Sequence, residues 1–138
     1  MRDTATYVYV HLVWATWDRL PLLVGERKTE VYTAIQRECA VLRADVLALG
    51  GVVDHVHLLI DLPPTVSISN LVKQVKGASS HLASARGNGA TPFKWQGAYG
   101  AFTLARQDVP YVRDYIQNQE LHHRNHSIDP DLERWLCE

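Results

Sequence analysis

The stretch that most constrains the fold is Asp54–Ile60, an apolar segment interrupted by two histidines, His55 and His57. In a β-strand successive side chains point to opposite faces, so the two imidazoles share one face and Val56 and Leu58 share the other. A strand with one wholly apolar face is typical of the interior of a sheet. Two imidazoles side by side on such a strand are placed to bind one metal ion.

The histidine pair alone does not establish a metal site. Seven histidines among 138 residues give about 0.35 His-x-His pairs by chance. An isolated pair is more often two half-buried strand residues. A metal site therefore needs a third ligand and a reacting group elsewhere in the chain.

The composition is that of an ordinary soluble globule. With 138 residues, 46% of them apolar and 21% charged, the chain is expected to form a single domain over residues 1–138. The longest apolar run, Val46–Val53, is far shorter than the ~20 residues of a membrane helix, and no secretory segment precedes it. We therefore expect a cytoplasmic protein without a membrane partner. Cys39 and Cys137 belong to no Cys-x-x-Cys pair and are expected to be free thiols.

The net charge of −1 argues against a strongly basic nucleic-acid binder. The charges are unevenly distributed, because the span from Lys73 to Arg124 contains seven basic and three acidic residues. The sequence is therefore compatible with a local basic face.

The pattern of apolar residues predicts alternating strands and helices. Strand-like segments occur at 7–14, 46–49, 52–61 and 99–104, and helical patterns at 26–41, after Ser67, at 108–123 and briefly from Asp129. Gly50-Gly51 is expected to form the turn between the second and third strands, and Ser67 to cap the helix that follows it. This order predicts a ferredoxin-like (RRM-like) α+β sandwich, in which helices cover one face of an antiparallel sheet and another helix follows near the C-terminus.

Two regions offer candidate contacts with nucleic acid. Lys73 and Lys76 lie off the apolar stripe of the helix after Ser67, where lysines are either solvated or bound to phosphates. Trp95 follows a predicted flexible loop at 86–91 and adjoins a lysine. It either packs in the core or stacks on an unpaired base.

The helix predicted over residues 108–123 carries a candidate reacting group. Tyr115 and Gln119 are four residues apart and share one face, with His122 about one turn later. Two imidazoles and one amide oxygen form a neutral ligand set that suits a divalent cation whose other positions go to water and phosphate. A phenol beside such a cation can attack a phosphodiester and form a covalent intermediate.

Several motifs, in the same order, resemble one known family. His55–His57, Lys76–Ser80, Trp95–Tyr99 and Tyr115–His123 are similar to motifs of the single-tyrosine transposases in the His-hydrophobic-His (HUH) endonuclease superfamily, the insertion-sequence type. The last block is especially similar to REP-associated tyrosine transposases. The resemblance spans about residues 7–124, and the family's order of elements agrees with the fold predicted here.

The resemblance implies roles for individual residues. Tyr115 is expected to attack single-stranded DNA and leave a 5′-phosphotyrosine link, while His55, His57 and Gln119 hold Mg²⁺ or Mn²⁺ against the scissile phosphate. DNA with hairpin ends is the expected partner, and the family implies a homodimer in which the tyrosine helix of one subunit completes the partner's site. The candidate DNA contacts are Lys73, Lys76, Trp95, Arg113, His122 and His123. For the two histidines, as for Asp54, three roles stay open: support of the metal site, contact with DNA, and simple solvation.

Two other classes of metal-dependent hydrolase also contain a His-x-His pair, but this chain does not fit either of them. The metallo-β-lactamase pattern needs an aspartate where this chain has Leu59, and a (β/α)₈ hydrolase needs about 250 residues. The alternative that stays open is a non-catalytic RRM-like module that binds single-stranded RNA or DNA, although its ribonucleoprotein motif is not recognisable here. Such a module would keep its affinity in EDTA, whereas tyrosine-dependent nicking would not survive metal removal.

Overall fold

The structure is a computed structural model that describes residues 4–85 and 92–133. Its elements are β1 (Tyr9–Ala15), η1 (Trp17–Arg19), α1 (Gly25–Val41), β2 (Asp45–Val52), β3 (His55–Asp61), α2 (Ile68–Ala85), β4 (Gly100–Thr103), η2 (Arg106–Asp108), α3 (Val109–Gln117), α4 (Gln119–Arg124) and α5 (Pro130–Glu133). The two η elements are single turns of 3-10 helix.

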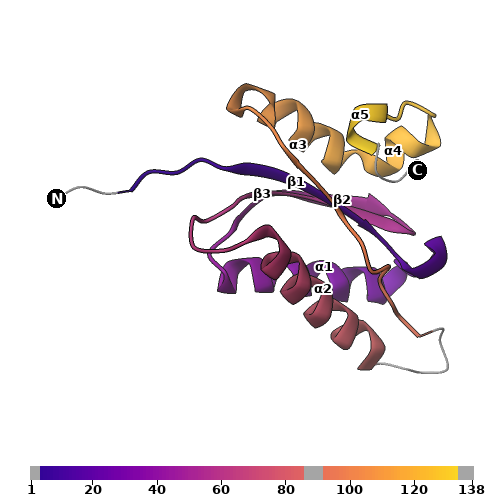
Figure 1. Cartoon of the computed structure of the whole chain (residues 1–138). Coiled ribbons are helices and arrows are strands. Elements are labelled where there is room, and N and C mark those ends of the chain that lie inside the picture. The colour runs from indigo at the N-terminus through magenta and orange to yellow at the C-terminus, as the bar shows by residue number, and fades with distance from the viewer. Residues whose placement is uncertain (1–3, 86–91, 134–138) are drawn as a thin grey trace.

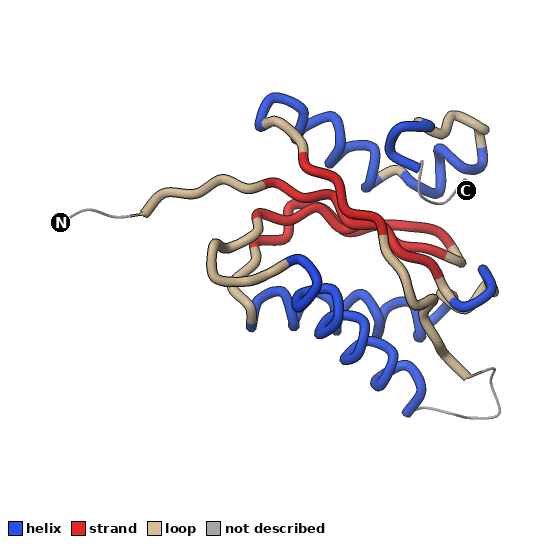
Figure 2. Tube along the Cα trace, in the orientation of Figure 1, coloured by secondary structure: helices blue, strands red, loops and turns tan. Residues whose placement is uncertain are grey.

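The four strands form one antiparallel sheet in the order β2-β3-β1-β4. Helices α1 and α2 cover one face and α3, α4 and α5 lie over the other, as Figure 1 shows. The sheet is thus the middle of three layers (Figure 2). This is the ferredoxin-like α+β arrangement predicted from the sequence, followed by the predicted tyrosine-bearing helix.

The alternation of side chains along β3 separates two cores. Val56 and Leu58 are fully buried in the larger core, against α1 and α2. Leu59 faces the other way and packs with Val112 and Ile116 of α3 in a smaller core. The two histidines of β3 share this second face, as the strand periodicity predicts.

Helices α1 and α2 are held on the sheet by the apolar stripes expected from the sequence. Ile35 of α1 and Leu71 and Val75 of α2 are fully buried. The hydroxyl of Ser67 accepts a hydrogen bond from the backbone N–H of Asn70 at 3.1 Å. The predicted N-cap of α2 is therefore confirmed.

The turn predicted at Gly50-Gly51 is wrong. Both glycines lie inside β2, and the chain reverses at Val53-Asp54 instead. A Cβ atom on Gly50 would lie 2.2 Å from the carbonyl oxygen of Ile116 in α3. The glycine thus allows the backbone of a helix to approach the strand, a packing requirement that has the same sequence signature as a turn.

The helix predicted over residues 108–123 is interrupted in the structure. Asn118 leaves the helical region, with φ −112° and ψ 28°, and separates α3 from α4. Its side-chain amide donates a hydrogen bond to the carbonyl oxygen of Asp114 at 2.8 Å. Such local side-chain bonding competes with continuation of the helix.

Among the described residues, no helix combines the length and apolar character needed to cross a bilayer. Cys39 is a buried free thiol, as expected. The loop predicted at 86–91 and the thiol of Cys137 lie outside the described residues.

Candidate metal and tyrosine site

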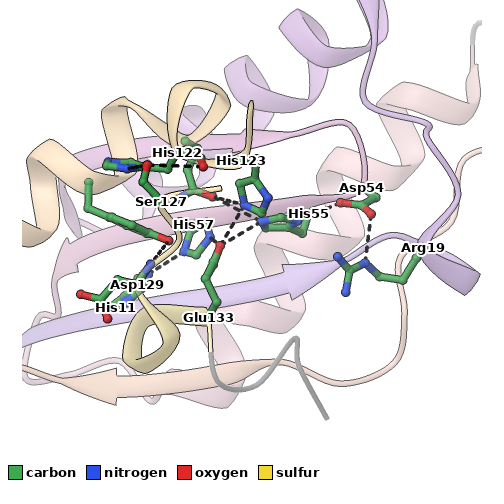
Figure 3. Close-up of polar contacts among 12 residues, drawn as sticks. His11, Arg19, Asp54, His55, His57, His122, His123, Ser127, Asp129 and Glu133 are labelled. Atoms are coloured by element: carbon green, nitrogen blue, oxygen red, sulfur yellow. Dashed lines mark hydrogen bonds and ion pairs between the residues drawn. The ribbon is translucent and has the colours of Figure 1, made fainter. Parts of the chain in front are cut away.

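His55 and His57 lie on the face of the sheet that α3, α4 and α5 cover. Their strand, β3, is interior, between β2 and β1. Both side chains are fully buried, and their ring centroids are 5.1 Å apart. The two Nε2 atoms converge on a residue of α5 (Figure 3).

That residue is Glu133, the last described residue of α5. Its Oε1 atom lies 3.0 Å from His57 Nε2, 3.4 Å from His55 Nε2 and 3.1 Å from His123 Nε2 (Figure 3). The carboxylate is buried, with 2% of the residue exposed. One ligand atom from each of His55, His57 and Glu133 lies within 4.8 Å of the others, which is compatible with a shared metal ion.

Gln119, the third ligand that the resemblance implied, lies in the same place. It is the first residue of α4 and is buried. Its Oε1 atom is 3.3 Å from His55 Nε2 and 3.1 Å from His123 Nε2. The break at Asn118 directly precedes this residue, so the orientation of Gln119 is set by α4 rather than by one continuous helix.

A second set of residues orients the two imidazoles from behind. His55 Nδ1 donates to Asp54 Oδ1 at 2.8 Å, and the other carboxylate oxygen of Asp54 accepts from Arg19 Nε at 3.2 Å. His57 Nδ1 shares a 2.8 Å hydrogen bond with His11 Nε2. These contacts occupy both Nδ1 atoms and leave both Nε2 atoms directed at the site, as outer-shell partners of metal-binding histidines do.

The charges of the site are strongly coupled. Burial by itself raises the pKa of the Glu133 carboxyl, but hydrogen bonds from His55 and His57 outweigh it and hold that pKa far below its usual range. Burial lowers the pKa of His55, yet its bonds to Asp54 and Glu133 prevail and raise it. Burial dominates at His57, whose pKa is lowered. A negative carboxylate therefore faces one imidazole that binds a proton readily and one that does not.

Tyr115 of α3 lies at the edge of the histidine cluster. Its ring centroid is 6.1 Å from that of His57, and the ring stacks on His122 at 4.6 Å. The hydroxyl accepts a hydrogen bond from the backbone N–H of Asp129 at 3.1 Å. Burial raises the pKa of this phenol to about 12, so it stays protonated at neutral pH. One chain thus brings together the tyrosine, both histidines and the glutamine.

The structure does not favour the base-stacking role considered for Trp95. Only 6% of the residue is exposed, and the ring packs edge-on against Trp14 and Phe93. Its indole N–H donates to Ser79 Oγ at 2.9 Å. The side chain therefore belongs to the larger core and is closed to a ligand.

The two predicted lysine contacts lie on α2, across the sheet from the histidines. Lys73 is exposed. The amine of Lys76 donates to the backbone carbonyls of Gln96 and Ala98, which fastens the segment before β4 to the helix. Lys76 thus has a structural task that the sequence did not indicate.

The remaining predicted contacts lie on the helices above the site. Arg113 is exposed on α3. His122 is half-buried, and its Nδ1 lies 3.0 Å from Ser127 Oγ. His123 touches both Gln119 and Glu133 and so belongs to the site itself.

His11 and Glu133 were not among the site residues predicted from the sequence. The strand period offered a signal for His11. Val10 and Leu12 are fully buried on one face of β1, so His11 between them must point to the opposite face. No comparable signal existed for Glu133, because the described part of α5 has four residues and no readable period.

Comparison with known proteins identifies the chain's relatives. Residues 4–119 match the family described as "Transposase IS200 like". The transposase of insertion sequence IS200 from Salmonella typhimurium is 28% identical over 115 residues, covering 79% of this chain and 74% of that protein. The ISDra2 transposase TnpA of Deinococcus radiodurans is 28% identical over 127 residues, covering 86% and 91%.

Solved structures agree with these matches. A Deinococcus radiodurans protein described as a transposase superposes with a TM-score of 0.67 and 26% identity, over 86% of this chain and 95% of that one. A REP-associated tyrosine transposase, solved bound to a REP hairpin, shares the fold with a TM-score of 0.66 at 17% identity, over 89% and 74%. The chain therefore belongs to the IS200-like transposase family.

Proposed function

We propose that this transposase cleaves and rejoins single-stranded DNA through a covalent 5′-phosphotyrosine intermediate on Tyr115. The observation that carries the proposal is the meeting of the Tyr115 phenol with the His55 and His57 imidazoles beneath one helical layer. A phenol beside a buried cluster of ligand atoms is the arrangement that metal-assisted attack on phosphorus requires.

The ligand atoms fit a small divalent cation, Mg²⁺ or Mn²⁺. The distances from Glu133 Oε1 to His57 Nε2 and from Gln119 Oε1 to His55 Nε2 are 3.0 and 3.3 Å. Neighbouring ligands about 2.1 Å from an octahedral ion lie about 3 Å apart. Glu133 Oε2 is also buried and has no hydrogen-bond partner within the described part of the chain. Unpaired buried acceptors are uncommon in native structures, and a carboxylate oxygen in this state is suited to bind a cation.

In this proposal His55, His57, Gln119 and Glu133 would hold the cation. The carboxylate of Glu133 makes this ligand set anionic, whereas His55, His57 and Gln119 alone form a neutral set. A cation held there would supply Lewis-acid chemistry, polarising a phosphate oxygen. Tyr115 Oη attacks phosphorus, forming an O–P bond as the P–O3′ bond breaks. The phenol loses its proton, and the departing 3′-oxygen gains one. Rejoining is the reverse attack by a 3′-hydroxyl, so it needs no external energy source.

The access to the site sets a condition on this reaction. Tyr115 is 3% exposed, and its hydroxyl is bonded to the backbone of Asp129. A phosphodiester reaches the hydroxyl only after the backbone at Asp129 has moved away from it. We propose that binding of DNA accompanies this movement.

We further propose that the protein acts in the cytoplasm on DNA with hairpin ends and works as a homodimer. Hairpin binding is suggested by the REP-associated transposase that shares the fold. In the present chain α3 lies on its own sheet, which favours a site formed within one subunit. The alternative within the dimer proposal is that the tyrosine helix of one subunit completes the site of its partner.

The test is covalent capture. End-labelled single-stranded DNA from the flanks of the gene is incubated with protein in Mn²⁺ or EDTA and resolved on a denaturing gel. We expect an adduct in Mn²⁺ that Tyr115→Phe abolishes and Tyr111→Phe retains, because Tyr111 is an exposed tyrosine of the same helix. An adduct formed equally by the Tyr115 variant would refute the assignment. Binding that is indifferent to EDTA, with no adduct, would support the binding-module alternative.

A further inference from the structure

A second group of residues lies at the end of β1 beside His55. Ala15, the last residue of β1, pairs with His55, and Trp17 follows it in η1. The indole of Trp17 is 49% exposed. Lys94 Nζ lies 3.9 Å from its ring centroid. The large aromatic ring is therefore held on the surface next to a cation instead of packing in either core.

Trp17 forms one side of a pocket with a volume of about 290 Å³. The other lining residues are Asp18, Arg19 and Gln96, which contribute a carboxylate, a guanidinium group and an amide. The pocket thus combines an aromatic surface with hydrogen-bond donors and acceptors, the features that recognise a planar heterocycle with polar edges.

The turn that carries this pocket has an unusual backbone. Asp18 and Arg19 have φ values of 56° and 55°, in the left-handed region that residues other than glycine rarely adopt. Two hydrogen bonds hold the turn in this conformation. Thr16 Oγ1 donates to the carbonyl oxygen of Leu20 at 2.7 Å, and Trp17 N donates to the carbonyl oxygen of Lys94 at 2.8 Å. Trp17 is therefore presented on a turn that its neighbours hold in place.

The pocket is joined to the histidine site by two hydrogen bonds. Arg19 Nε donates to Asp54 Oδ2 at 3.2 Å, and His55 Nδ1 donates to Asp54 Oδ1 at 2.8 Å (Figure 3). A ligand that contacts Arg19 in the pocket would therefore be separated from His55, a proposed metal ligand, only by Asp54. On a DNA strand, that is a place for a base near the scissile phosphate.

We propose that the Trp17 pocket binds one unpaired base of the DNA strand, which stacks on Trp17 while Asp18 and Gln96 contact its edge and Lys94 attracts the backbone. This subsite rests on the proposed function, since it places the base relative to the bond that is cut. It would give the enzyme a protein-read position in its cleavage sequence, in addition to any hairpin that it recognises.

The test measures binding in EDTA, so that no cleavage intervenes. Fluorescein-labelled single-stranded DNA from the gene's flanks is titrated by anisotropy with wild type, Trp17→Ala and Trp17→Phe. Loss of one base stack weakens binding by about fivefold to 150-fold, so we expect a loss in that range for the alanine variant and a much smaller one for phenylalanine. The matched control is Tyr7→Ala, which removes another exposed ring beside a cation, Arg106, before the start of β1. Thermal unfolding of each variant verifies that it folds.

An abasic strand distinguishes stacking from attraction to phosphates. Strands with a single abasic site at successive positions keep their charge, and at one position wild type should lose the same factor that Trp17→Ala loses. The alanine variant should lose nothing further at that position.

Two results overturn the inference: equal binding by wild type and Trp17→Ala, or an equal loss in Trp17→Ala and Tyr7→Ala. If the Tyr115 adduct still forms in either case, the proposed function stands without this subsite. If Trp17 governs base-dependent binding but the wild-type protein forms no adduct in Mn²⁺, the subsite stands and the proposed cleavage chemistry is refuted.

Discussion

Replacing Gly50 by alanine tests how closely α3 must approach the sheet. The added Cβ would lie 2.2 Å from the carbonyl oxygen of Ile116, whereas real contacts of this kind are at least 3.0 Å. The helix must therefore retreat by about 0.8 Å, and the obstructing atom is backbone rather than a side chain that can rotate. Overpacking costs about 1–3 kcal/mol, and a rigid obstacle favours the upper end. For a chain of this length, the melting temperature should fall by about 10 °C.

The same displacement moves Tyr115, the residue before Ile116. A shift of about 1 Å in a reacting group can cost about a hundredfold in rate, so adduct formation should slow by a similar factor. The assays are calorimetric unfolding and the initial rate of adduct formation in Mn²⁺. Gly77→Ala in α2 is the control, because a Cβ there meets nothing within 4 Å and alanine should stabilise the helix by up to about 1 kcal/mol. A Gly50→Ala protein with unchanged stability and full activity would refute the packing argument.

Three further predictions follow from the buried charges and the thiol. Glu133→Gln keeps the size of the side chain but removes its charge, so the affinity for Mn²⁺ should fall at least about tenfold in titration calorimetry; unchanged affinity would exclude Glu133 as a ligand. Because the pKa of Glu133 is depressed on folding, its charge stabilises the metal-free protein above a pH of about 4.3, and this stability is lost as pH falls through the folded pKa. The difference in unfolding free energy between wild type and Glu133→Gln should therefore shrink as the pH falls from about 4.3 to 3, and a constant difference over that range would contradict the charge coupling. Burial, followed by the charge of Glu38, raises the pKa of Cys39 to about 11, so in a Cys137→Ser background a thiol reagent at neutral pH should label the protein only after denaturation; rapid labelling of the native protein would show that Cys39 is accessible.

The fold was predictable wherever a local period reflects burial. The strand period of β3 correctly separated Val56 and Leu58 from the histidines, because one face of that strand must be apolar. The pair Gly50-Gly51 was misread as a turn. Gly50 is required by the backbone of α3, a segment more than 60 residues later whose position no local pattern reveals, and Gly51 by the backbone of the neighbouring strand β3.

The candidate site shows the same division. The four-residue spacing of Tyr115 and Gln119 indicated a shared helical face, and both residues do lie at the histidine cluster, although a break at Asn118 separates them. Glu133 could not be predicted, because only the tertiary packing of α5 brings it to His57. Trp95 has an aromatic and basic context that favours nucleic-acid contact, but its ring is buried against Trp14, a tertiary contact that the local context does not reveal.

The most direct test of the proposed function is to locate the covalent bond. The Mn²⁺-dependent adduct is trimmed with nucleases, digested with a protease and sequenced by tandem mass spectrometry. The account predicts a nucleotide 5′-phosphate attached to the peptide that contains Tyr115, and a free 3′-hydroxyl on the released DNA fragment. A nucleotide on any other residue, or cleavage that leaves a 3′-phosphate, would contradict it.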